Sequence, residues 1–234
     1  MQQYFAKNKN LDLEDGDYHH IKNVMKMKRG DLIKVVYDNV IYTCKLNNVS
    51  NKSTFDIINK EEKTDKKLSV SVAFSLIKEQ KLNYLLQKTT ELGVNKLIPI
   101  ETKRSVVKIE GNKEKTKIDR WKKICKEASE QSFRADIPEI SGILTLKNLV
   151  NLDYDLKLVC SLNKNTKNIK KILEKNNKCV KILLVVGPEG GFDPLEEEYL
   201  LENEFKSVSL GENVLRAETA PVVALSMINY EFMR

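Results

Sequence analysis

The pattern of apolar residues along the chain changes near position 68. After that point, short apolar runs alternate with segments whose apolar residues recur at helical spacing. Residues 156–162 and 180–186 are near-continuous apolar runs, typical of buried parallel strands, and residues 81–92 follow a helical pattern that ends at Gly93. Because such alternation builds a parallel sheet covered by helices, residues 67–234 are predicted to form an α/β domain with a mostly parallel sheet.

The N-terminal residues 1–66 are rich in β-formers instead. Residues 32–37 and 40–46 are predicted strands joined by the turn pair Asp38-Asn39, and residues 53–58 are a third predicted strand. A helical stretch is expected at residues 18–26. Several short strands in so short a segment predict a small β-barrel. The charged run at residues 61–67 lacks apolar side chains and is the predicted linker.

The first functional signal is the segment Gly187-Pro188-Glu189-Gly190-Gly191-Phe192, which directly follows the apolar run at 180–186. It precedes a strong helix start, in which Asp193 can cap, Pro194 fits the first turn and Glu196 can close a capping box. Glycines let a backbone approach a ligand closely, and such loops bind ligands in α/β sheets. A plain tight turn is the alternative. Neither a GxGxxG pattern nor a P-loop is present, which argues against NAD and ATP.

The second signal is the segment Leu210-Gly211-Glu212-Asn213-Val214-Leu215-Arg216-Ala217-Glu218-Thr219-Ala220. It follows a predicted strand at 206–210 and opens a predicted helix at 217–233. Three hydrogen-bonding side chains, Arg216, Glu218 and Thr219, lie within four positions, and a core helix would not place them there without partners. A surface Arg216–Glu218 ion pair with a Thr219 cap is the alternative.

Together these segments resemble the two signature motifs of the RsmE family, the 16S rRNA uridine N3-methyltransferases of the SPOUT superfamily. The resemblance extends to Thr90-Glu91-Leu92-Gly93-Val94, to Arg104-Ser105, and to Glu127-Ala128-Ser129-Glu130-Gln131-Ser132-Phe133-Arg134 with Pro138 after it. Near the N-terminus, His20, Val24 and Gly30-Asp31 fall in the family's order. The chain departs from the family pattern at Gln3, Lys26 and Ala217, where Arg, Arg and Thr are usual.

The resemblance implies an N-terminal PUA-like β-barrel and a C-terminal SPOUT domain with a trefoil knot, whose loops bind S-adenosylmethionine. It also implies a homodimer that modifies ribosomal RNA, free or within the 30S subunit. By carry-over, the expected cofactor-binding residues are Leu162, Gly187, Pro188, Glu189, Gly190, Gly191, Leu210, Gly211, Val214, Leu215, Arg216, Thr219 and Ala220.

The chemistry of uridine methylation suggests further roles. The ring nitrogen attacks well only as an anion, so the enzyme must accept a proton and stabilise charge on the carbonyl oxygens. Arg134 and Arg216 are the candidates for stabilising that charge, because a planar guanidinium suits a carbonyl oxygen. Glu218 or Glu189 is the candidate proton acceptor. The residues expected to contact RNA are His20, Lys26, Lys81, Arg104 and Arg134, whereas Trp121 lies on an apolar helical face and is predicted to be core.

Composition sets outer bounds. The net charge of +7 is compatible with a polyanionic partner. The longest pure apolar run, residues 182–186, is far shorter than the roughly 20 residues of a membrane span, and no secretory signal is visible. The four cysteines are scattered, so free thiols in the cytoplasm and no metal site are expected. Two alternatives remain: a methyltransferase of this fold acting on another RNA position, or a non-catalytic RNA-binding or ribosome-assembly factor.

Overall fold

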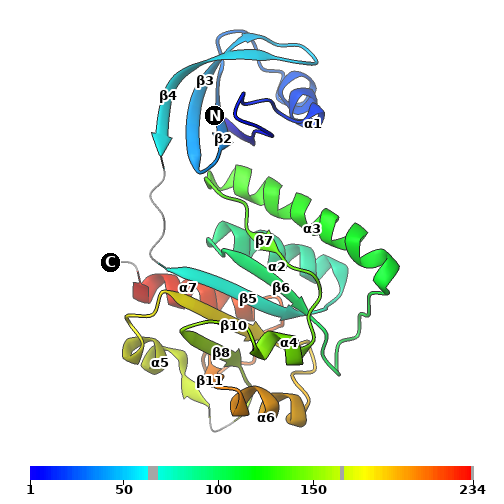
Figure 1. Ribbon diagram of the computed structural model, residues 1–234, viewed down its shortest axis with the longest axis vertical. Coiled ribbons are helices and arrows are strands. Elements are labelled where there is room, and N and C mark those ends of the chain that lie inside the picture. Colours follow the sequence, from blue (N-terminus) through cyan, green and yellow to red (C-terminus); the bar gives the residue numbers. More distant parts are fainter. Residues whose placement is uncertain (63–67, 164–165, 233–234) are drawn as a thin grey trace. The chain divides into compact units, whose positions relative to one another are not determined.

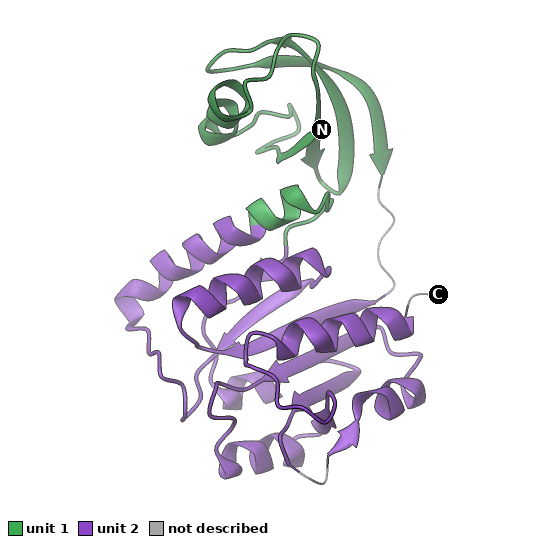
Figure 2. Ribbon diagram, turned by 180° about the vertical axis from the view of Figure 1, so that it is seen from behind, with its two compact units in different colours: residues 1–65, 126–137 green, residues 66–125, 138–234 purple. Residues whose placement is uncertain are grey.

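A computed structural model of the protein describes residues 1–62, 68–163 and 166–232. The chain divides into two compact units (Figure 2). Unit 1 draws on Met1–Asp65 and on Lys126–Ile137, and unit 2 draws on Lys66–Cys125 and Pro138–Arg234. The segment 126–137 therefore groups with the N-terminal residues, although it lies far from them in the sequence.

Unit 1 contains a four-stranded sheet in the order β1-β2-β3-β4 (Figure 1). Its strands are β1 (Gln2–Phe5), β2 (Leu32–Tyr37), β3 (Val40–Asn48) and β4 (Thr54–Glu62). Strand β1 runs parallel to β2, and the other pairs are antiparallel. Asp38 and Asn39 both have positive φ, 49° and 60°, as expected for a hairpin turn matched to the twist of its strands. The predicted strands are confirmed, and β1 was not predicted.

Two other predictions for unit 1 need correction. The helical stretch begins earlier than residue 18, because α1 covers Asp15–His19 with a capping box between Glu14 and Asp17, and a π-helical turn follows at His20–Val24. The predicted linker was placed too early, because β4 continues through Glu62. Glu61 and Glu62 form ladder pairs with Ile41 and Val40 despite their charge, since edge strands tolerate charged residues. Residues 63–67 lie outside the described part of the chain.

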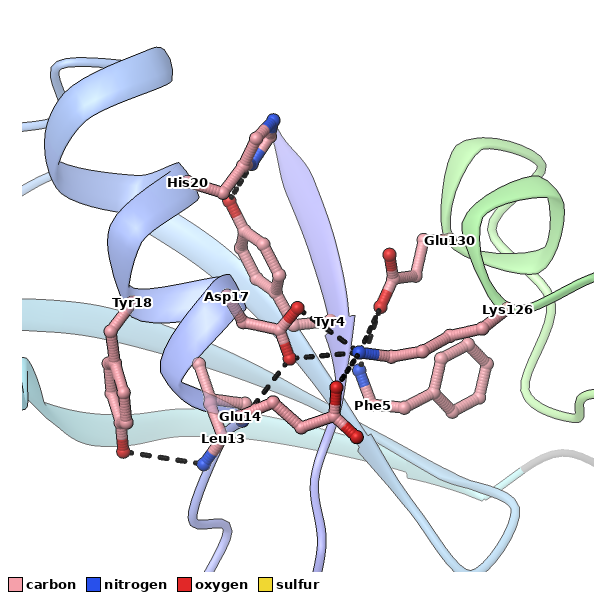
Figure 3. A network of polar contacts seen from close by, with 9 residues as sticks. All are labelled: Tyr4, Phe5, Leu13, Glu14, Asp17, Tyr18, His20, Lys126 and Glu130. Atoms are coloured by element: carbon pink, nitrogen blue, oxygen red, sulfur yellow. Dashed lines mark hydrogen bonds and ion pairs between the residues drawn. The ribbon is translucent and has the colours of Figure 1, made fainter. Parts of the chain in front are cut away.

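A charged network inside unit 1 joins the end of α3 (Gly111–Gln131) to the N-terminal segment (Figure 3). The Lys126 ammonium lies 3.0 Å from Asp17, 3.2 Å from Glu14 and 3.6 Å from Glu130. The backbone N–H of Phe5 also donates to Glu130, at 3.4 Å. Three carboxylates thus share one cation. Burial raises the pKa of Glu130 to about 7; Lys126 opposes this rise and Asp17 adds to it.

Unit 2 contains a seven-stranded sheet in the order β7-β6-β5-β10-β8-β11-β9, in which every pair is parallel. In chain order the strands are β5 (Ser69–Ser75), β6 (Lys96–Ile100), β7 (Glu139–Ile140), β8 (Leu156–Cys160), β9 (Lys167–Asn168), β10 (Lys181–Val186) and β11 (Lys206–Ser209). The predicted parallel α/β sheet is confirmed. Strand β10 lies between β5 and β8, so the two most apolar runs are neighbours at the centre.

Helices cover both faces of this sheet, and the alternation of strand residues creates two cores. On one face, Phe74 and Leu184 pack in a cluster that includes residues of α2 (Glu79–Glu91), α5 (Ile169–Lys175) and α7 (Ala220–Phe232). Trp121 of α3 belongs to the same cluster, is 2% exposed and meets Phe74 edge-on, which confirms it as a core residue. On the other face, Ala73 and Val185 pack with α4 (Leu146–Val150) and α6 (Pro194–Glu202).

The last helix begins later than predicted, at Ala220, and Ala217–Thr219 forms a turn before it. The reason is Pro221. It occupies the first turn of α7, where its missing N–H costs nothing. A helix beginning at Ala217 would place that proline one full turn inside and remove a backbone hydrogen bond. The strands β7 and β9 and the helices α4 and α5 were also not predicted.

Candidate functional site

The carboxyl ends of β8, β10 and β11 open onto a cavity of about 770 Å³ in unit 2. Because these strands are parallel and adjacent, the loops that follow them meet at one edge of the sheet. The described residues that line the cavity include Lys81 and Arg104 together with the following residues of the three loops: Ser161, Leu162, Asn163, Gly187, Pro188, Glu189, Gly190, Gly191, Leu210, Gly211, Asn213, Val214, Leu215, Arg216 and Ala217. The two glycine-bearing segments therefore converge on one site.

All but one of the residues expected to bind a cofactor line this cavity. The exception is Thr219, whose backbone N–H donates to the Arg216 carbonyl at 2.9 Å within the turn before α7. Sequence reasoning missed several lining residues, among them Phe192, Pro194, Glu197 and Asn213. The sequence contained a signal for Glu197. It lies four positions after the capping residue Asp193, so both residues lie on the same face at the start of α6.

Two glycines of the loop after β10 are required by its shape. A Cβ atom on Gly187 would lie 3.1 Å from the ring of Phe192 and 3.3 Å from its backbone nitrogen, closer than ordinary contacts. Phe192 is itself buried in the core and cannot move away easily. Gly191 has φ +67°, a conformation that side chains disfavour. The loop therefore folds back tightly over Phe192 and leaves its backbone facing the cavity.

Polar contacts from two other segments hold this loop in place. The Lys81 ammonium, at the start of α2, lies 3.0 Å from the Glu189 carboxylate, and Arg104 donates from a terminal nitrogen to the Gly190 carbonyl at 3.0 Å. Beneath them, the Ser75 hydroxyl donates to the Val186 carbonyl at 3.3 Å. Lys81 and Arg104, which were expected to contact RNA, hold the glycine-rich loop in this structure.

Neighbouring lysines lower the pKa of two acidic groups around the loop. Burial alone would raise the pKa of Glu189, but the hydrogen bond from Lys81 and the charges of Lys81 and Lys78 outweigh it, so its pKa is lowered. The hydrogen bond from Lys103 lowers the pKa of Asp193 in the same way. Both carboxylates are therefore anionic at neutral pH and weak bases.

Arg216 and Glu218 occupy contrasting environments in the second glycine-bearing segment. Arg216 is exposed, lines the cavity, and its guanidinium makes no ion pair or hydrogen bond with the described residues. The alternative of a surface Arg216–Glu218 pair is therefore wrong for the described chain. Glu218 is 8% exposed, does not line the cavity, and its Oε2 atom has no hydrogen-bond partner among the described residues.

Comparison with known proteins agrees with this geometry. Residues 64–229 match the family model of an RNA methyltransferase domain, and residues 13–58 match that of an RNA methyltransferase PUA domain. The chain is 35% identical to ribosomal RNA small subunit methyltransferase E of Bacillus subtilis (strain 168), over 99% of this chain and 97% of the relative.

The chain belongs to the ribosomal RNA small subunit methyltransferase E family. It is also 33% identical to the Mesomycoplasma hyopneumoniae (strain 232) protein of that name, over 89% of this chain and 88% of the relative. The crystal structure of the Neisseria gonorrhoeae protein of that name, bound to S-adenosyl methionine, superposes with a TM-score of 0.87 at 25% identity, covering 98% of this chain and 97% of that one. The resemblance inferred from the motifs, and the fold class with its N-terminal PUA domain, are thereby confirmed.

The remaining candidates of this methyltransferase lie in unit 1. Arg134 is 7% exposed, and its guanidinium binds Asp136 through two nitrogens, at 2.5 and 3.3 Å. It is not among the residues that line the cavity. Its carbonyl accepts a hydrogen bond from the Gln3 amide at 2.6 Å, so Gln3, which replaces the family's usual arginine, is a buried structural residue.

The two N-terminal RNA candidates differ in surroundings. His20 is half-buried, and its Nδ1 lies 3.0 Å from the Tyr4 hydroxyl. Burial, with Asp17 and Glu130, raises the pKa of Tyr4, so the hydroxyl stays protonated and can donate to the imidazole. Lys26 is exposed and has φ 49°.

The four cysteines are free, with Cys44 and Cys125 buried and Cys160 and Cys179 only half-buried. Burial raises the pKa of Cys160, which lines the cavity, to about 12. Within the described residues, no group of three or more His, Cys, Asp or Glu is placed to hold a metal ion. No described helix is long and apolar enough to cross a membrane.

Proposed function

We propose that this protein transfers a methyl group from S-adenosylmethionine to N3 of a uridine in the ribosomal RNA of the small subunit. The observation that carries the proposal is the convergence of the two glycine-bearing loops on one cavity. Membership of the family, and the cofactor bound in the Neisseria gonorrhoeae structure, support the same assignment.

The residues around the cavity fit S-adenosylmethionine. The tight loop at Gly187 brings backbone to the cavity where a side chain would collide with Phe192. Leu162 and Val214 are 65% and 74% exposed and line the cavity, so apolar surface is available for an adenine ring. We assign cofactor binding to the three loops that follow β8, β10 and β11, including the backbone of Gly187, Gly190 and Gly211.

The cofactor, when bound, supplies a methyl group already activated on a sulfonium centre. The protein must bring uridine into line, accept the N3 proton and stabilise the charge left on the carbonyl oxygens. Arg216 suits the stabilising role, because its guanidinium lines the cavity and is unpaired among the described residues. Arg134 remains a second candidate, although Asp136 already engages its guanidinium.

The proton acceptor is better assigned to Glu218 than to Glu189. The contacts of Glu189 with Lys81 lower its pKa and make it a poor base. Glu218 is buried and has a carboxylate oxygen without a partner among the described residues. Because Glu218 does not line the cavity, we propose that the proton reaches it through an intervening water.

We assign RNA phosphate contacts to Lys81 and Arg104, and further RNA contacts to His20 and Lys26 in the PUA-like domain, which we place at residues 1–66. The segment 126–137 groups with that domain in space. We further propose that the protein is cytoplasmic and forms a homodimer. Light scattering of the purified chain would test the homodimer.

Two measurements test the function. Calorimetry with S-adenosylmethionine should show stoichiometric binding, whereas a non-catalytic RNA-binding factor would give no heat. Mass spectrometry of ribosomal RNA from a strain lacking the protein should show the loss of one N3-methylated uridine in the small subunit. Loss of a methyl group at a ribose, in another RNA, or at no position would contradict the proposal.

A further inference from the structure

Five charged side chains line the cavity: Lys81, Arg104, Glu189, Glu197 and Arg216. Lys81 and Glu189 compensate each other at 3.0 Å. Among the described residues, Glu197 is therefore the one acidic side chain lining the cavity that forms no ion pair. A carboxylate facing a partly enclosed cavity without a cation favours a cationic group of the ligand in that place.

The carboxylate of Glu197 is held in position from below. It lies in the first turns of α6, whose start is fixed by the Asp193 cap and the Glu196 capping box. Lys103 contacts both of those acids: its ammonium lies 3.0 Å from Asp193, and its backbone N–H donates to Glu196 at 2.7 Å. Neither acid is thus available to a ligand in the way that Glu197 is.

A second contact orients Glu197 toward the loop after β8. The Ser161 hydroxyl donates a short hydrogen bond to Oε1 of Glu197, and the same hydroxyl oxygen accepts from the backbone N–H of Asn163 at 3.0 Å. Oxygen Oε2 has no partner among the described residues. Ser161, Asn163 and Glu197 all line the cavity, so this preoriented acceptor belongs to the binding site itself.

We propose that Glu197 binds the α-ammonium group of the methionine part of S-adenosylmethionine. An ammonium has three N–H donors, and each can form a charge-assisted hydrogen bond with a carboxylate oxygen. A sulfonium has no hydrogen-bond donor. The inference rests on the proposed function and adds to it a residue that recognises the amino-acid end of the cofactor. Ser161 is then a positioning residue, because it acts on the ligand only through Glu197.

The test is calorimetry on the full-length protein with three ligands that differ in their charged groups. Of the two cationic groups, S-adenosylmethionine has the ammonium and the sulfonium, and S-adenosylhomocysteine has only the ammonium. 5′-Methylthioadenosine has neither, because it lacks the whole amino-acid end with its ammonium and carboxylate. Glu197→Gln should weaken binding of the first two about tenfold and leave the third unchanged. Ser161→Ala should cause a smaller loss with the same ligand pattern. Glu198→Gln is the matched control, because Glu198 is exposed on the same helix and does not line the cavity.

Three results would overturn the assignment. Unchanged affinity for S-adenosylmethionine in Glu197→Gln would exclude Glu197 from binding. An equal loss for all three ligands would indicate a distorted cavity. A loss confined to S-adenosylmethionine would place the carboxylate at the sulfonium instead of the ammonium. Failure of the wild-type protein to bind any of the three would refute the proposed function itself, which keeps the two failures distinguishable.

Discussion

Glu130→Gln is expected to change the pH dependence of unit 1 stability more than any other single substitution in its charged network (Figure 3). Three carboxylates, those of Glu14, Asp17 and Glu130, surround the single ammonium of Lys126. The Glu130 side chain is 17% exposed, and its backbone contact with Phe5 is long, at 3.4 Å. Water and hydrogen bonds therefore compensate the charge of Glu130 poorly, and burial raises the pKa of its carboxyl group.

The magnitude follows from the pKa of Glu130, which is raised from 4.5 to about 7. At about 1.36 kcal/mol per pKa unit, this difference corresponds to about 3 kcal/mol. The folded state binds the proton more tightly than the unfolded state, so this contribution is fully present below pH 4.5. It is lost as the pH rises through about 7. Glutamine resembles the protonated acid, so the variant should match wild type near pH 4.5 and be more stable by about 3 kcal/mol at pH 8.

Hydrogen exchange measured by mass spectrometry, on the full chain at several pH values, localises the effect. Peptides from residues 1–62 should become better protected in Glu130→Gln above pH 7. Fluorescence of Trp121, which reports on unit 2, should not change. Glu127→Gln is the control, because Glu127 is exposed on the same helix and forms no ion pair with the described residues. A variant that follows the wild-type pH profile, or that loses stability at pH 8, would refute the reasoning.

Three substitutions test the cavity. Arg216→Lys keeps the charge but loses the planar fork, so the single-turnover rate should fall about 100-fold while circular dichroism stays unchanged; a wild-type rate excludes the role. Gly187→Ala places a Cβ against Phe192. Denaturation should show a free energy of unfolding lower by about 1–3 kcal/mol, and calorimetry should show weaker cofactor binding. Unchanged stability and affinity would mean that the loop relaxes freely around the added methyl group. Arg104→Ala removes the hydrogen bond to the Gly190 carbonyl, so cofactor affinity should fall. It also removes a proposed phosphate contact, so the slope of RNA affinity against salt concentration should decrease by about one charge. An unchanged salt slope would exclude the phosphate contact.

The parts of the fold that the sequence predicted are those in which local pattern and packing agree. The apolar runs around Leu158 and Leu184 had to be buried on both faces, and buried neighbours of this kind form parallel strands. The loops that follow them were predictable as a site, because glycines stood at strand ends. The α5 helix was hidden, because its short apolar set, Ile169, Ile172 and Leu173, lies among lysines.

Long-range polar contacts were beyond sequence reasoning. No local pattern indicates that Lys126 lies against Asp17, more than one hundred positions earlier, or that Ser161 holds Glu197. Such pairs depend on which surfaces the fold brings together, and many lysines and glutamates would have seemed equally suitable partners. Glu130 illustrates the consequence: it was recognised as part of a motif, but its protonation depends on neighbours that only the structure identifies.

The two cations that hold the glycine-rich loop are unequal candidates for the RNA contact. The Lys81 ammonium is committed to Glu189, so a phosphate would have to compete with an anion already in place. Arg104 donates to the Gly190 carbonyl from one terminal nitrogen, and no other partner of its guanidinium is found among the described residues. A guanidinium carries five N–H donors, so it can hold the loop and still bind a phosphate. Only six of the 40 basic residues in the chain are arginines, and Arg104 is one of them. Lysine could not replace it, because an ammonium lacks the planar fork that would contact the loop and a phosphate together.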